Sequence, residues 1–358
     1  MSYHAIMAFA TTGNKRAIIS ILVGLLILSF GCRSSKQSRE LASLKEVGDR
    51  SASSNGDALP ADLRVNVVDQ DTQEILPGSV VAIGEEYLLT DTSGSVESKN
   101  QLESETTNVK VRARGFQPYE ESIRLDPGEN DTTIALASVA ATGSLERTSL
   151  RPRAYLTIDD GPSGKWTPKV LDILAREKVS ATFFLVGFRA SRRVSLARRI
   201  FLEGHEIGNH TYSHDYEKLY SGSRKNLLDS LSKNGRTLED ILGFAPKVWR
   251  PPGGVTGNFR PGWQSSITYS GYVTVLWNVS TGDGSTQTTS RQMVVNTKRF
   301  LDRLSPKEPA IILMHDVREP IVKALPRIIK EVRRRGYQFD VVKADTRVNG
   351  LVLGPWRR

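Results

Sequence analysis

The feature that most constrains the fold is a regular alternation of apolar runs with helical patterns, which begins at Ala154 and continues almost to the C-terminus. The strand-like runs are "AYLTI", "SATFFLVG", "HEIGN", "YVTVLW", "AIILMH" and "FDVV". Helices are expected at 167–177, 193–203, 224–242, 290–304 and 321–335. Strand and helix in turn predict an α/β fold with a parallel sheet, in the form of a barrel, and a site at the carboxyl ends of the strands.

Before this region, residues 61–140 show short alternating runs such as "LRVNVVD" and "NVKVRARG", separated by Pro-Gly and Ser-Gly turns. This pattern predicts a small all-β sandwich. The order "VVDQDTQEILPGSVVAI", "TDTSGSV" and "VRARGFQPYEESIRLDPGE" resembles carboxypeptidase regulatory-like, transthyretin-type modules. Because this segment contains no catalytic cluster, we expect a spacer, with glycan or protein binding as the alternative.

The N-terminus has the pattern of an export signal. Lys15 and Arg16 precede the apolar run "AIISILVGLLILSFGC", which is typical of a secretory signal peptide over residues 1–32. The single cysteine, Cys32, ends this run, and "LSFGC" resembles a bacterial lipoprotein cleavage box. We therefore expect export to the cell envelope, in the periplasm or at the outer membrane, with a lipid anchor on Cys32. Ordinary signal cleavage or an uncleaved anchor helix is the alternative.

The expected organisation follows from these patterns. Ser-rich and charged residues at 33–60 are typical of a flexible linker, and a second linker is expected at 141–152. The domains on either side of that second linker are the sandwich at 61–140 and the α/β domain at 153–358.

Charge restricts the partners only weakly. A net charge of +10 favours an anionic wall or membrane surface, and it is compatible with peptidoglycan without identifying it. We expect no nucleic-acid partner, because the protein is predicted to be exported and no nucleic-acid-binding motif is recognisable.

Residues suited to catalysis stand where the predicted strands end. "YLTIDDGPSG" closes the first strand with Asp159 and Asp160, whose mutual repulsion a cation would relieve. His210 and His214 lie four positions apart in "HTYSH" and point the same way if the backbone turns helically there. With Asp160 they form a two-histidine, one-carboxylate set that suits Zn²⁺, or another divalent ion such as Co²⁺.

Two further strand ends carry Arg250, in "WRPPGG", and His315, in "AIILMHD". A guanidinium is permanently charged and can keep a neighbouring carboxylate ionised, and the ordinary pKa of histidine suits proton transfer. Taken alone, Arg250 could equally be a surface arginine and His315 a structural interior histidine. Their occurrence at several strand ends together favours a catalytic site.

The motifs "TIDDGP", "HTYSH", "RPPGG", "WNVSTGDG" and "LMH" resemble, in order, those of the NodB-type polysaccharide deacetylases, carbohydrate esterase family 4. The resemblance covers residues 153–343. It implies a distorted (β/α) barrel that removes acetyl groups from N-acetylglucosamine polymers, chiefly peptidoglycan and chitin, or from acetylated xylan.

The same resemblance implies a role for each residue of the site. Asp159 would be the base that activates water, and His315 the acid that protonates the leaving amine. Arg250 would orient the base and Asp283 would orient His315. The remaining positions are the metal ligands Asp160, His210 and His214, the acetyl-methyl contact Leu313, and Gly253, near which a backbone N–H would stabilise the oxyanion.

Two positions depart from the family pattern. Relatives usually carry an aromatic residue where Gly253 stands and a tryptophan where Gly284 stands. We therefore expect a wider and wetter pocket that takes a bulkier or branched glycan.

The leading interpretation is a metal-dependent hydrolase that removes N-acetyl groups from N-acetylglucosamine, most simply in peptidoglycan. An O-acetyl esterase acting on polysaccharide and a tethered glycan-binding pseudoenzyme are the alternatives. The presence of both an acid and a base beside the predicted metal site argues against the pseudoenzyme, because a binding module needs neither.

Overall fold

The computed structural model describes residues 60–98, 102–139, 151–255, 259–260, 262–348 and 350–353. The predicted signal peptide with Cys32 lies outside the described residues, as do nearly all of the two predicted linkers. Export, the lipid anchor and the domain boundaries therefore stay predictions. No helix in the described ranges is long and apolar enough to cross a membrane.

The first described part contains two small sheets. One has the strand order β4-β1-β7 and the other β3-β2-β5-β6. Their strands are β1 (Ala61–Asp69), β2 (Val80–Ile83), β3 (Glu86–Leu89), β4 (Ser95–Glu97), β5 (Thr106–Arg112), β6 (Tyr119–Arg124) and β7 (Gly128–Leu136). Alternate residues of β1, β2 and β5, such as Leu63, Val81 and Val109, meet in one hydrophobic cluster. The assignment of this part to a particular β module stays a prediction.

The second part is built on a curled, mainly parallel sheet with the order β13-β14-β8-β9-β10-β11-β12-β16, in which β15 also pairs with β8. Only the pairing of β12 with β16 is antiparallel. The strands are β8 (Arg153–Asp159), β9 (Thr182–Leu185), β10 (Glu206–Asn209), β11 (Val248–Trp249), β12 (Val273–Val275), β13 (Val279–Ser280), β14 (Ala310–His315), β15 (Gln338–Asp340) and β16 (Val352–Leu353). This curled sheet fits the NodB-type barrel that the motifs predict.

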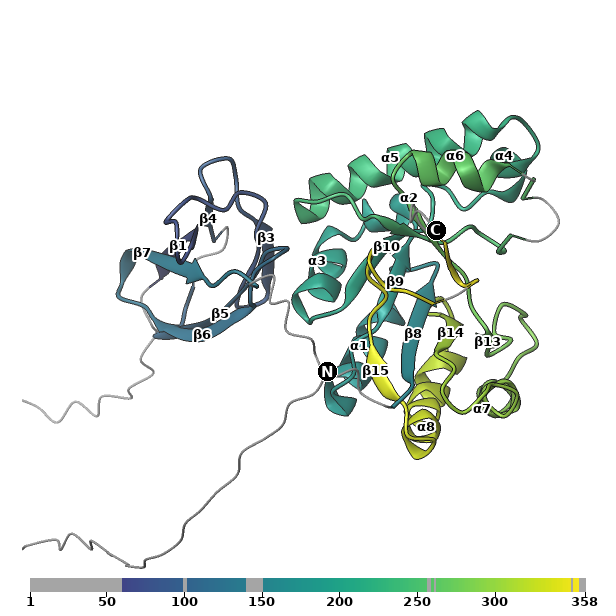
Figure 1. Ribbon diagram of the computed structural model, residues 1–358. Coiled ribbons are helices and arrows are strands. Elements are labelled where there is room, and N and C mark those ends of the chain that lie inside the picture. The colour runs from purple at the N-terminus through teal and green to yellow at the C-terminus, as the bar shows by residue number, and fades with distance from the viewer. Residues whose placement is uncertain are drawn as a thin grey trace, which may run out of the picture. The chain divides into compact units, whose positions relative to one another are not determined.

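Helices surround this sheet (Figure 1). They are α1 (Thr167–Glu177), α2 (Gly187–Ala190), α3 (Val194–Leu202), α4 (Tyr216–Tyr220), α5 (Arg224–Leu242), α6 (Trp263–Tyr269), α7 (Ser290–Leu301) and α8 (Pro320–Arg334). The five expected helices are found within a few residues of their expected bounds. Sequence periodicity missed α2, α4 and α6, together with β11, β13 and β16, because none of these is long enough to show a clear repeat.

The two faces of the central strands have different environments, which positions the site. On β8, Leu156 and Ile158 belong to a large hydrophobic cluster that also includes side chains of the helices. Tyr155 belongs to a separate hydrophobic cluster on the other face of the sheet. Because side chains alternate along a strand, Thr157 and Asp159 share the face of Tyr155. The strand therefore ends with a carboxylate on the inner face of the curled sheet.

Candidate active site

Asp159 and Arg250 form a buried ion pair at the carboxyl end of β8. Asp159 is 3 % exposed and Arg250 is 0 % exposed, so the alternative of a surface arginine is wrong. Arg250 Nη1 donates to Asp159 Oδ1 and to Thr157 Oγ1, each at 2.8 Å, and Nε donates to the Val275 carbonyl at 3.0 Å. The guanidinium is thus fixed on three sides, and it fixes the carboxylate in turn.

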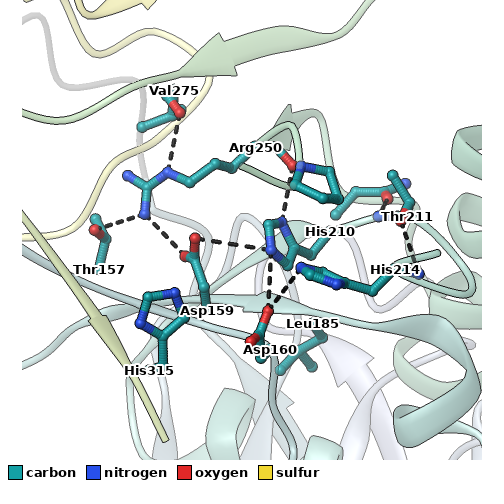
Figure 2. A network of polar contacts seen from close by, with 12 residues as sticks. Thr157, Asp159, Asp160, Leu185, His210, Thr211, His214, Arg250, Val275 and His315 are labelled. Atoms are coloured by element: carbon teal, nitrogen blue, oxygen red, sulfur yellow. Dashed lines mark hydrogen bonds and ion pairs between the residues drawn. The ribbon is translucent and has the colours of Figure 1, made fainter. Parts of the chain in front are cut away.

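Asp160 turns away from its neighbour toward the two histidines (Figure 2). Its backbone has a φ of 71°, in the left-handed region, so Asp160 faces both histidines, whereas Asp159 pairs with Arg250 and reaches only His210, at 3.8 Å. Asp160 Oδ1 lies 3.3 Å from His210 Nε2 and 3.0 Å from His214 Nε2. Burial raises the pKa of Asp160, but the nearby imidazoles outweigh it and hold that pKa well below its usual range.

The three side chains fit a divalent metal ion. One ligand atom from each of Asp160, His210 and His214 lies within 4.8 Å of the others. Asp160 Oδ1 is buried, and its ion pairs with His210 and His214 are its only polar contacts among the described residues, as expected of an oxygen that shares a cation with two imidazoles. Two nitrogens and one oxygen are a common ligand set for Zn²⁺ sites that keep an open position.

The loop after β10 brings the histidines together in a way that the sequence analysis did not foresee. The segment is not helical: Thr211 has a φ of 64° and His214 a φ of 55°. The expectation of a helical turn is therefore wrong, and left-handed residues aim both rings at Asp160 instead. His210 Nδ1 donates to the Arg250 carbonyl at 2.8 Å, which leaves Nε2 for a metal. Asn209 Oδ1 accepts from the Thr211 N–H at 2.9 Å and holds the start of the loop.

His315 and Asp283 form the second pair of the site. His315 is the register partner of Asp159 across β14 and β8, so both side chains emerge on the same face. Asp283 Oδ1 accepts from His315 Nδ1, and Asp283 Oδ2 accepts from the His315 backbone N–H, both at 2.9 Å. Burial lowers the pKa of His315, but the hydrogen bond and charge of Asp283, with the charges of Asp159 and Asp160, outweigh it and raise that pKa to about 9.

These side chains line one cavity of about 360 Å³. All of the residues predicted for the active site line this cavity except Arg250, which contacts Asp159 instead. Its lining includes Asp159, Asp160, His210, His214, Gly253, Asp283, Gly284, Leu313 and His315. Gly253 has a φ of 73°, which suits glycine, and none of the described residues accepts its backbone N–H.

Sequence reasoning missed four residues around the cavity. Thr157, which supports Arg250, could have been found two positions before Asp159 on the same face of the strand. Tyr216, Trp277 and Arg318 also line the cavity. Trp277 is the first residue of the motif "WNVSTGDG" and could have been found there, whereas nothing in the local pattern marks Tyr216 or Arg318.

Part of the expectation about pocket width is wrong. A Cβ atom at Gly253 would meet Tyr216 Cε1 at 2.7 Å, and one at Gly254 would meet Trp277 Cη2 at 2.8 Å. Two rings from elsewhere in the chain therefore fill this side of the pocket, and the absence of an aromatic residue at position 253 does not leave it wide.

Comparison with known proteins agrees with this geometry. The family described as "Polysaccharide deacetylase" matches residues 146–260. A peptidoglycan-N-acetylglucosamine deacetylase of Bacillus cereus is 34 % identical over 192 residues, which cover 52 % of this chain and 84 % of the relative. A second enzyme of that name from Bacillus cereus is 31 % identical over 195 residues, covering 53 % and 69 %.

A solved structure of a Streptococcus mutans CE4 esterase is also similar, with a TM-score of 0.51 and 32 % identity over 54 % of this chain and 87 % of that one. The chain belongs to the polysaccharide deacetylase family. It is therefore a hydrolase, which confirms the prediction from its motifs.

Proposed function

We propose that this protein removes N-acetyl groups from N-acetylglucosamine residues of peptidoglycan at a Zn²⁺ site. The observation that carries the proposal is the placement of two distinct proton-transfer groups, Asp159 and His315, on register-paired positions beside a three-residue ligand set. The names of the Bacillus cereus relatives support the choice of substrate.

The roles follow from the contacts. Asp160, His210 and His214 would hold the ion, which when bound supplies a Lewis acid for the acetyl carbonyl and for water. Asp159, oriented by its hydrogen bond from Arg250, takes a proton from the attacking water. His315, held by Asp283, then gives a proton to the leaving amine, so glucosamine and acetate are the products.

Two further groups are positioned for the acetyl substituent. Leu313 lines the cavity on the strand that carries His315 and offers an apolar contact for the methyl group. The backbone N–H of Gly253 is suited to the oxyanion that forms as water attacks, because such preorganised donors stabilise developing charge.

Acetate release by variants tests this function. Asp159→Asn removes the base while keeping the side-chain shape, so acetate release from purified peptidoglycan is expected to fall by a factor of about 10² or more. Asp240→Asn makes the same chemical change at an exposed position on α5 that does not line the cavity, and it should leave the rate unchanged.

The choice of substrates separates the alternatives. Release from acetylated xylan but not from peptidoglycan would favour the O-acetyl esterase. Binding of peptidoglycan without release from any acetylated glycan would favour the pseudoenzyme and contradict the proposal. We also propose that the protein acts in the cell envelope on a lipid anchor at Cys32; metabolic labelling with a palmitate analogue, lost in Cys32→Ser, tests this proposal.

A further inference from the structure

The two sides of the cavity differ in chemical character. On the side of the ligand set, Tyr216 lies edge-on to His214, with ring centroids 5.3 Å apart, and together with Trp277 it occupies the space above the two glycines of the "RPPGG" segment. On the side of His315, position 284 has no side chain. A Cβ atom there would meet only His315 Cε1, at 3.8 Å, which is an ordinary contact. The cavity is therefore walled by rings at one end and open beside the acid at the other.

Arg318 lines this open end. Its Nη2 donates to the carbonyls of Asp283 and Ser285, the latter at 2.7 Å, so the guanidinium is anchored across the glycine. Both contacts use Nη2. Among the described residues nothing accepts from the N–H groups on Nη1 and Nε of Arg318, so these donors are available to a ligand.

The charge of Arg318 also has no ionic partner in the part of the chain that the structure describes. Arg318 forms no salt bridge with any described residue, in contrast to Arg250, which pairs with Asp159. Arg318 contacts the carbonyl of Asp283, whose carboxylate is turned to the backbone and ring of His315. A fixed, partly buried cation without a counterion, at the open end of a glycan cavity, favours an anionic substituent of the substrate.

We infer that Gly284 and Arg318 form a subsite for a carboxylate carried by the glycan beside the sugar that loses its acetyl group. The inference rests on the proposed function and narrows its substrate class to acidic glycans. In peptidoglycan strands, the muramic acid next to an N-acetylglucosamine carries a free carboxylate on its lactyl ether wherever no peptide stem is attached to it as an amide. A neutral N-acetylglucosamine polymer carries none.

A matched pair of substrates tests the subsite. Peptide-free strands of alternating N-acetylglucosamine and muramic acid carry free lactyl carboxylates, and methylamidation of these groups removes the charge without shortening the strand. We measure kcat/KM for acetate release from the acidic strands and from the methylamidated strands, and take the ratio of the first to the second. The wild type should prefer the acidic strands, and Arg318→Gln should lower that preference about tenfold, as expected for the loss of one charged hydrogen bond.

Two control variants make the result specific. Arg327→Gln removes the same charge from an exposed position on α8 and should keep the wild-type ratio. Gly284→Trp should lower the ratio by filling the open end, and its backbone is not in the left-handed region, so a side chain is tolerated there.

The outcomes are distinguishable. Equal losses on both substrates in Arg318→Gln would mean that the arginine only holds the loop at 283–285, and this would overturn the inference while the deacetylase stands. A wild-type ratio near one would overturn it as well. Failure of the wild type to release acetate from either strand would instead contradict the proposed function itself.

Discussion

At the scale of single residues, the site depends on two adjacent carboxylates that do different work. Asp159 continues the strand and pairs with Arg250, whereas Asp160 adopts a φ of 71° and faces the histidines. The change of backbone region between neighbours separates the proposed base from the proposed metal ligand within one dipeptide. Residue types predicted that one carboxylate binds a metal while the other stays free, and the family resemblance implied that Asp159 is the base; the geometry that separates the two carboxylates is visible only in the backbone.

We predict that His315 sets the pH dependence of the reaction. Its pKa is raised to about 9, so it carries its proton at neutral pH and can act as the acid. The rate should therefore fall as pH rises through about 9. Asp283→Asn removes the strongest of the influences that raise this pKa, so the fall should move to lower pH by one unit or more, measured from kcat across pH 6 to 10.

A change in rate without a change in profile would contradict this assignment. If Asp283→Asn lowered kcat equally at every pH, Asp283 would hold the position of His315 without tuning its proton affinity. Asp302→Asn, at an exposed position just after α7, provides the control in which neither rate nor profile should change.

At the scale of elements, a buried amide pair connects α5 to the loop that carries the histidines. Asn234 of α5 donates to Asn209 Oδ1 at 2.8 Å and to the Leu185 carbonyl of β9 at 2.9 Å, and both asparagines are 0 % exposed. The same Asn209 oxygen holds the Thr211 N–H. A helix outside the sheet thus fixes the metal-binding loop through one shared acceptor.

Removal of this connection should weaken the metal site without touching a ligand. Asn234→Ala removes one of the two donors from each of two buried acceptors, so we expect a loss of about 1–3 kcal/mol in the free energy of unfolding. Metal affinity should fall about 10-fold to 100-fold, as is typical when outer partners of metal ligands are lost. Titration with Co²⁺, followed by its absorbance, measures the second effect, and unchanged affinity would show that the loop is held by other contacts.

The alternation of strands and helices was sufficient to predict the second part of the chain at this scale. Long elements such as α5 and β14 were recovered because their apolar periodicity spans several turns or a whole strand. The loop at 210–214 was not, because its geometry also depends on contacts with distant residues, such as the hydrogen bond from His210 Nδ1 to the Arg250 carbonyl. The rings of Tyr216 and Trp277 were missed for a related reason: their place over Gly253 and Gly254 follows from chain folding alone.

At the scale of the whole molecule, the parallel sheet explains why motifs far apart in the sequence form one site. The carboxyl ends of β8, β11 and β14, or the residues just after them, supply Asp159, Arg250 and His315. In such barrels, the active site is generally formed by residues at the carboxyl ends of several strands. The β strands at 61–136 supply none of the residues that line the cavity. Any contribution of these strands to the choice of substrate is therefore separate from the hydrolysis.

The central claim is that Asp160, His210 and His214 hold a metal ion that the hydrolysis requires. The most direct measurement is the rate of acetate release from purified peptidoglycan by the purified protein before chelation, after removal of metal, and after titration with Zn²⁺. We predict loss of activity on chelation and full recovery at one Zn²⁺ per chain. An undiminished rate in metal-free protein, or no recovery with any divalent ion despite binding at this site, would contradict the account.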